Sequence, residues 1–266
     1  PAWLCLIALL CALGAARATS AAGAAPVLAL RIDGAIGPAT ADQVERALER
    51  ATREGAQLVV LQMDTPGGLD TAMRSIIRAV LASPVPVAAF VAPSGARAAS
   101  AGTYILYAAH VAAMAPATNL GAATPVAVGL PGFGSAEPPA PSPASGASEP
   151  GAGHDAPAAK RINDASAYIR SLAQLRGRNL EWAEQAVRES VSLSAADALE
   201  RKVIDVVASD LAGLLRQLDG RVLRLGDAQG TRITLATAAA AVVAHEPGWR
   251  GRLLAVISDP SLALIL

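Results

Sequence analysis

The stretch Leu58–Gly68, LVVLQMDTPGG, decides the fold. Its first six residues are almost continuously apolar, which is typical of a strand buried on both faces of a parallel sheet. The turn residues 64–68 follow, and the apolar residues of segment 69–81 then recur at helical spacing. The stretch therefore predicts one strand–turn–helix unit of a parallel α/β domain.

The same alternation extends along the chain in both directions. Further strands are predicted at 27–32, 85–91, 111–114 and 203–207, helices at 40–54, 100–108, 160–176, 180–187 and from 194, and a hairpin at 222–225 and 232–235. Strands alternating with helices predict right-handed βαβ units and a largely parallel sheet. An all-helical protein is the alternative, and the Gly/Pro punctuation between segments argues against it.

Composition excludes several classes of protein. Of the 266 residues 53% are hydrophobic, which excludes a disordered chain, and two cysteines are too few for a disulfide scaffold. The 22 Lys and Arg balance the 22 Asp and Glu, so no basic surface favours nucleic-acid binding.

Both ends of the chain carry apolar segments. Residues 4–16 and the small residues after them are typical of a secretory leader, with a buried or anchoring helix as the alternative. Cys5 and Cys11 fall inside this leader, so the mature chain would have no cysteine, although a lipidated Cys11 is an alternative. Residues 253–257 and 261–266 are expected to lead into a membrane region. We therefore predict a signal peptide at 1–25, a folded domain at 26–235 with a Pro/Ala-rich mobile loop at 124–159, and a C-terminal segment at 236–266.

Three places carry residues suited to chemistry. The turn Asp64–Gly68 opens a helix, where backbone N–H groups can bind an oxyanion, although Pro-Gly-Gly is often only a turn. Ser100 lies among small residues at a loop-to-helix junction, so it is either a nucleophile or an N-cap. Lys160 opens the helix after the predicted loop. A lysine sheltered from water becomes less basic and can serve as a general base, whereas the alternative is a solvated surface lysine.

Other catalytic and binding groups are not indicated. The histidines, among them His110 and His245, have no spacing suited to a metal site or a Ser-His-Asp triad. The Pro-Gly-Gly turn lacks the spacing of a phosphate-binding loop, so nucleotide binding is not expected. No cofactor and no metal are predicted.

The motifs taken together resemble the NfeD family of membrane-bound serine proteases of the ClpP class, which are encoded beside stomatin-like proteins. The resemblance covers about residues 27–209 and rests on Asp64-Thr-Pro-Gly-Gly68, Gly95-Ala-Arg-Ala-Ala-Ser100-Ala-Gly-Thr-Tyr104, Met114-Ala-Pro116, Asn119-Leu-Gly-Ala122, Lys160-x-x-Asn163-Asp164, Tyr168-Ile-Arg-Ser-Leu-Ala173, Arg176-Gly-Arg-Asn179 and Ala198-Leu-Glu-Arg-Lys-Val-Ile-Asp205.

The resemblance implies a fold and a site. The fold would be the ClpP/crotonase type, an α/β superhelix of ββα units with a largely parallel sheet. Ser100 would be the nucleophile and Lys160 the general base of a Ser–Lys dyad. Backbone N–H groups of Gly67 or Gly68 and of Ala101 would form the oxyanion hole. The long Pro/Ala-rich stretch between Ser100 and Lys160 departs from the family pattern and puts the unliganded position of Lys160 in doubt.

The resemblance also implies partners and a location. The chain would cleave hydrophobic segments of a stomatin-like membrane protein and form a homodimer. It would be membrane-associated through a missing C-terminal region, with the protease domain on the extracytoplasmic side. Two rival functions stay open: a non-catalytic membrane scaffold for stomatin-like proteins, and a crotonase-like acyl-CoA enzyme, against which the leader argues because CoA esters are cytoplasmic.

Overall fold

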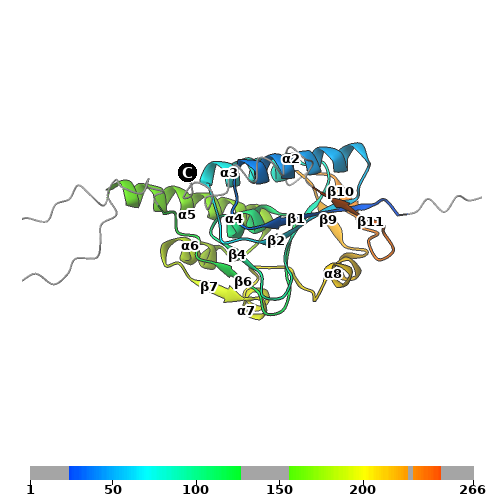
Figure 1. Cartoon of the computed structure of the whole chain (residues 1–266). Helices are drawn as coiled ribbons and strands as arrows, with labels where there is room; N and C mark the ends of the chain where they lie inside the picture. Colours follow the sequence, from blue (N-terminus) through cyan, green and yellow to red (C-terminus); the bar gives the residue numbers. More distant parts are fainter. Residues whose placement is uncertain (1–23, 127–155, 227–229, 247–266) are drawn as a thin grey trace, which may run out of the picture.

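The computed structural model describes residues 24–126, 156–226 and 230–246, and Figure 1 shows their arrangement. A six-stranded sheet forms the centre of the domain, and every neighbouring pair of strands in it is parallel. Its strands, in spatial order, are β11 (Val242–His245), β1 (Val27–Asp33), β2 (Leu58–Asp64), β3 (Val87–Val91), β5 (Val111–Met114) and β8 (Val206–Val207). The predicted largely parallel sheet is therefore confirmed.

Alternate residues of the central strands are buried on opposite faces of the sheet. In β2, Val59, Leu61 and Met63 belong to one hydrophobic cluster, whereas Leu58 and Val60 belong to the other. Because successive side chains of a strand point to opposite faces, a strand covered on both sides must be apolar throughout. This explains why Gln62, which is only partly buried, is the one polar residue of the stretch 58–63.

Helices cover one face of the sheet, and a smaller group of elements covers the other (Figure 1). The first face is covered by α2 (Pro38–Arg53), α3 (Asp70–Ala82), α4 (Ala101–Ala108), α5 (Ala156–Arg176), α6 (Leu180–Arg188) and α7 (Ala195–Glu200). The second face is covered by α8 (Leu211–Leu218) and the antiparallel hairpin of β9 (Val222–Arg224) and β10 (Arg232–Thr234). The hairpin was predicted from the sequence, and α8 was not.

A second, three-stranded sheet lies beyond the carboxyl ends of the central strands. It consists of β4 (Arg97–Ala99), β6 (Asn119–Gly121) and β7 (Ser192–Ser194), none of which the sequence predicted. An isolated bridge between Thr65 and Ala98 joins it to the segment after β2. Ligand sites of parallel α/β sheets form at the carboxyl ends of the strands, which is where this small sheet lies.

Several predicted boundaries differ from the structure. Helix α2 begins at Pro38 and not at residue 40. Thr40 is its third residue, and the Thr40 hydroxyl accepts from the Gly37 N–H at 3.4 Å. Helix α5 begins at Ala156 and not at residue 160. The domain also continues past the predicted end at residue 235, because Val242–His245 pairs with β1.

Some predicted segments lie outside the described residues. These are the leader within 1–23, most of the Pro/Ala-rich stretch and the apolar segments after residue 246. Among the helices of the described ranges, none combines the length and the apolar character needed to cross a membrane.

Candidate active site

Ser100 lies at the turn from β4 into α4, in a backbone conformation that is rare for a residue with a side chain. Its φ is 50° and its ψ is −116°. A strained strand-to-helix turn of this kind is how hydrolases present a nucleophilic serine, with the hydroxyl raised clear of the backbone. The Ser100 hydroxyl makes no N-cap bond, and no hydrogen bond links it to another described residue. The N-cap alternative from the sequence therefore does not account for this side chain.

Hydrogen bonds from three segments hold the turn in place. The Ser100 N–H donates to the Gly121 carbonyl at 2.9 Å, and the Ala99 N–H donates to the Thr65 carbonyl at 3.0 Å. The fully buried Thr103 hydroxyl donates toward the carbonyls of Ala98 (2.8 Å) and Gly121 (3.0 Å). Since β4 and β6 are both fixed through these bonds, the unusual conformation of Ser100 is imposed by its surroundings.

Gly67 packs directly against Ser100. A Cβ atom at this position would lie 2.6 Å from the Ser100 Cβ and 3.1 Å from its Oγ. The φ of Gly67 is also 116°, which side chains rarely allow. Only glycine therefore lets the 64–68 turn approach Ser100 so closely.

The backbone N–H groups beside Ser100 differ in whether they already donate a hydrogen bond. The Gly67 N–H donates to the Thr65 hydroxyl at 3.1 Å. The N–H groups of Gly68 and Ala101 have no hydrogen-bond partner among the described residues. Ala101 is the first residue of α4, where the helix dipole also favours negative charge. Of the three predicted oxyanion donors, Gly68 and Ala101 are the two whose N–H groups could donate to a ligand oxygen without giving up a hydrogen bond to another described residue.

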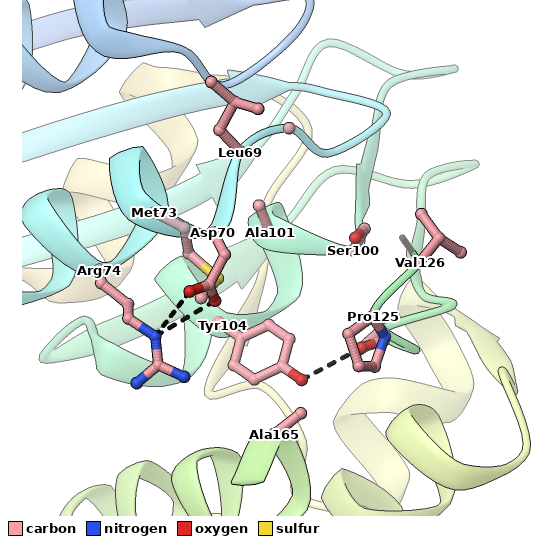
Figure 2. Close-up of a pocket in the computed structure, with 12 residues that line it drawn as sticks. Leu69, Asp70, Met73, Arg74, Ser100, Ala101, Tyr104, Pro125, Val126 and Ala165 are labelled. Carbon is pink, nitrogen blue, oxygen red and sulfur yellow. Dashed lines mark hydrogen bonds and ion pairs between the residues drawn. The ribbon is translucent and has the colours of Figure 1, made fainter. Parts of the chain in front are cut away.

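A cavity of about 150 Å³ opens beside Ser100 and is mostly apolar (Figure 2). Gly68, Ser100 and Ala101 line it together with apolar groups from α3, α4 and α5. These groups are Leu69, Met73, Tyr104 and Ala165. Such a cavity fits an uncharged, apolar side chain placed next to the serine.

Two titratable groups with shifted pKa values, Tyr104 in the cavity wall and His110 after α4, are unsuited to act as a base for Ser100. Tyr104 donates its hydroxyl to the Ala123 carbonyl at 3.1 Å, and burial raises the pKa of Tyr104, so it stays a neutral phenol. His110 accepts the Val87 N–H through Nδ1 at 3.2 Å, and burial lowers the pKa of His110 to about 3. His110 is thus a neutral group that accepts a backbone hydrogen bond at the start of β3.

Lys160 is not brought to the cavity in this structure. It is exposed on α5 and does not line the cavity, whereas Ala165 of the same helix does. Five residues correspond to a rotation of about 140° around a helix axis, so Lys160 points away from the side that Ala165 occupies. The expectation that Lys160 is sheltered from water is therefore not met, because the lysine lies on the face of α5 opposite its buried residues.

A charged cluster at one end of the cavity escaped the sequence analysis. Asp70 and Arg74 line the cavity and form an ion pair of 2.9 Å, drawn in Figure 2. Arg74 also reaches Asp164 of α5 at 2.6 Å. The i, i+4 spacing of Asp70 and Arg74 was a signal for the first contact, but nothing local indicates the second. No cluster of metal-binding side chains occurs among the described residues.

Known proteins match this chain both in sequence and in structure. A family model described as NfeD1b, N-terminal domain, matches residues 26–130. The membrane-bound protease PH1510 of Pyrococcus horikoshii is 35% identical over 249 residues, which are 91% of this chain and 52% of PH1510. The chain thus spans about half the length of that relative.

Solved structures cover nearly the same region. The 1510-N membrane-bound stomatin-specific protease, as a lysine-to-alanine mutant in complex with a substrate peptide, matches with a TM-score of 0.74 at 34% identity, covering 89% of this chain and 99% of that one. A serine-to-alanine mutant of the same protease matches with a TM-score of 0.71 at 34% identity, over 85% and 99% of the two chains. The 1510-N membrane protease specific for a stomatin homolog from Pyrococcus horikoshii matches with a TM-score of 0.69 at 32% identity. The match covers 88% of this chain and 99% of that one.

Proposed function

Because this chain belongs to the NfeD1b N-terminal domain family of membrane-bound proteases, we propose that it is a serine endopeptidase with Ser100 as its nucleophile. The observation that carries the proposal is the strained turn at Ser100, whose hydroxyl stands beside an apolar cavity and two unengaged N–H groups. Strained backbone conformations cluster at active sites, where the surrounding structure holds them in place.

The reaction follows from these groups. The neutral amine of Lys160 takes the proton of the Ser100 hydroxyl as Oγ bonds to the carbonyl carbon of a peptide. The carbonyl oxygen becomes an oxyanion, which the N–H groups of Gly68 and Ala101 stabilise. The intermediate then collapses, the C–N bond breaks and Lys160 returns the proton to the leaving amine. Water hydrolyses the acyl-enzyme by the same steps in reverse.

Two observations support Lys160 as the general base. It is supported by the relatives, which were studied with a lysine and with a serine replaced by alanine. It is also supported by the cavity, whose titratable lining residues among those described are only Asp70, Arg74 and Tyr104. For Lys160 to reach Ser100, the first turns of α5 must turn toward the cavity, since the lysine faces away from it here.

The substrate follows from the cavity and from the relatives. An apolar lining selects an apolar side chain next to the bond that is cut. The solved relatives are named as proteases specific for stomatin or a stomatin homolog, and the names of all the relatives describe a membrane-bound or membrane protease. We therefore propose a hydrophobic segment of a stomatin-like membrane protein as the substrate. Action on the extracytoplasmic side and as a homodimer belongs to the same proposal.

A fluorophosphonate probe tests the nucleophile. The probe reacts covalently with an activated serine, so we expect the wild-type chain to be labelled and the Ser100→Ala variant to remain unlabelled. The Ser192→Ala variant is a matched control, because Ser192 is an exposed serine of β7 away from the cavity. Labelling that persists in Ser100→Ala would contradict the assignment. No labelling of the folded wild type, with an apolar peptide present, would favour the non-catalytic scaffold.

A further inference from the structure

The motif Lys160-x-x-Asn163-Asp164 contains two polar residues that the proposed mechanism does not use. Both lie on α5, and each contacts a different neighbouring helix. Asp164 Oδ2 accepts from Arg74 Nη2 of α3 at 2.6 Å, and Asn163 Oδ1 accepts from Arg188 Nη2 of α6 at 3.2 Å. Helix α5 is thus held from two sides at two consecutive residues.

Each arginine is itself held by an acidic residue of its own helix. Arg74 Nε contacts Asp70 at 2.9 Å, and Arg188 Nε contacts Glu184 at 2.7 Å. Both pairs have the i, i+4 spacing that suits a helix surface. Because each guanidinium is already oriented, little side-chain freedom is lost when it meets α5.

Arg74 makes a second contact with α5. Its guanidinium lies 4.4 Å from the centroid of the Tyr168 ring, four residues after Asp164. Arg74 therefore contacts one side of α5 over a full helical turn, combining an ion pair with a cation–π contact. A contact of this length restricts both the position and the rotation of the helix.

The same contacts connect α5 to the serine. Tyr168 stacks on Tyr104 of α4 with a centroid separation of 6.2 Å, and Tyr104 lies four residues after Ser100. Ala165, directly after Asp164, lines the cavity, and Figure 2 shows it on the α5 side of the Tyr104 ring. The clamped part of α5 is thus set relative to the nucleophile.

We infer that Asn163 and Asp164 form a two-point anchor that positions Lys160 for its encounter with Ser100, an inference that rests on the proposed function. Three residues span at most about 11 Å of chain, so Lys160 stays near the anchor whatever conformation the start of α5 adopts. Asn163 and Asp164 are positioning residues, since neither lines the cavity. Their effect is to keep the amine at high local concentration beside the serine.

The test compares Asp164→Ala with Arg170→Ala on cleavage of an apolar peptide. Arg170 is a matched control, because it also joins α5 to a neighbouring helix, through an exposed 3.6 Å ion pair with Glu184. We expect Asp164→Ala to lower kcat by about 10- to 100-fold, since catalytic groups tolerate little misplacement, and to change KM by less than about threefold. Arg170→Ala should keep kcat within about twofold, and both variants should unfold within a few degrees of the wild type.

A double-mutant cycle separates positioning from a general loss of structure. If Arg74 and Asp164 act as one clamp, Arg74→Ala/Asp164→Ala should have about the kcat of Arg74→Ala alone. Asp164→Glu should recover part of the loss. The anchor is contradicted if Asp164→Ala keeps wild-type kcat or loses no more kcat than Arg170→Ala does. It is also contradicted if the loss of kcat in the double variant is the product of the losses in Arg74→Ala and Asp164→Ala.

The proposed function and the anchor fail in different ways. Activity that survives Ser100→Ala or Lys160→Ala overturns both, because the anchor presupposes the dyad. Activity that is lost in both of these variants, but is unchanged in Asp164→Ala, overturns the anchor alone.

Discussion

The two sides of the candidate site are built differently. Ser100 lies in a turn fixed by backbone hydrogen bonds from buried residues and by the close approach of Gly67. Lys160 lies on an exposed part of α5, whose ties to its neighbours are side-chain contacts at the surface. The serine side of the candidate site is therefore fixed by the fold, whereas Lys160 is exposed and does not line the cavity.

This difference separates stability from catalysis. Changes on the serine side should damage both folding and activity, since the same buried contacts serve both. Changes on the lysine side should damage activity while leaving the fold intact. Variants of the two sides should therefore differ in how much they lower the free energy of unfolding.

The largest effect is expected for Gly67→Ala. The new Cβ would meet the Ser100 side chain at 2.6 Å in a backbone conformation unfavourable for alanine. We expect a loss of about 2–4 kcal/mol in the free energy of unfolding from overpacking and strain. Displacing the nucleophile should also lower fluorophosphonate labelling about 100-fold. Urea denaturation and labelling rates measure the two effects.

Gly95→Ala is the control for Gly67→Ala. Gly95 also has a positive φ, of 91°, but a Cβ there would meet no atom within 4 Å. Gly95→Ala should lower the free energy of unfolding by only about 1 kcal/mol, through backbone strain, and should leave fluorophosphonate labelling intact. Equal losses in the two variants would show that the contact with Ser100 is unimportant.

An intermediate effect is expected from acid, through His110 at the end of α4. Burial lowers the pKa of His110 to about 3, whereas an unfolded histidine titrates near 6.5. Between these values the unfolded state binds more protons, so stability falls as the pH falls through this window. The free energy of unfolding should be about 2–3 kcal/mol lower at pH 4.5 than at pH 7.

The His110→Asn variant isolates this contribution. Its amide oxygen can accept the Val87 N–H in place of Nδ1, but it does not titrate in this range. Thermal unfolding from pH 7 to pH 4.5 should therefore show a shallower loss in the variant than in the wild type. Parallel curves would mean that His110 is not held neutral by burial.

The smallest effect on stability is expected for Lys160→Ala. The side chain is exposed, so the free energy of unfolding should change by no more than about 0.5 kcal/mol. Denaturant midpoints of the variant and the wild type should therefore coincide. A large loss would show that Lys160 is already packed against the domain, which would remove the contrast between the two sides.

The sequence predicted the parts of the fold that depend on local pattern. Strand β5 was predicted with its observed ends at 111–114, because a buried strand is apolar throughout. The strands β4, β6 and β7 were missed, since three residues carry no periodicity and their pairing joins distant segments. Edge strand β11 was missed for a similar reason, and it moves the end of the domain past residue 235.

The candidate site also has parts that local sequence indicated and parts that depend on contacts between distant segments. Small residues around Ser100 indicated a nucleophile, but only three-dimensional geometry distinguishes it from an N-cap. The Gly67 N–H donates to the Thr65 hydroxyl two residues before it, and the residue types alone do not show whether such a turn contact forms. The clamp between Arg74 and Asp164 spans 90 residues of sequence, and no local pattern reports a contact of that kind.

The proposed reaction requires a serine and a lysine, distant in the sequence, to act together on an apolar peptide. The most direct measurement is digestion of an apolar peptide library by the wild type, Ser100→Ala and Lys160→Ala, followed by mass spectrometry of the products. The account predicts cleavage beside apolar residues by the wild type and none by either folded variant. Cleavage by Ser100→Ala or Lys160→Ala at the wild-type rate would contradict it.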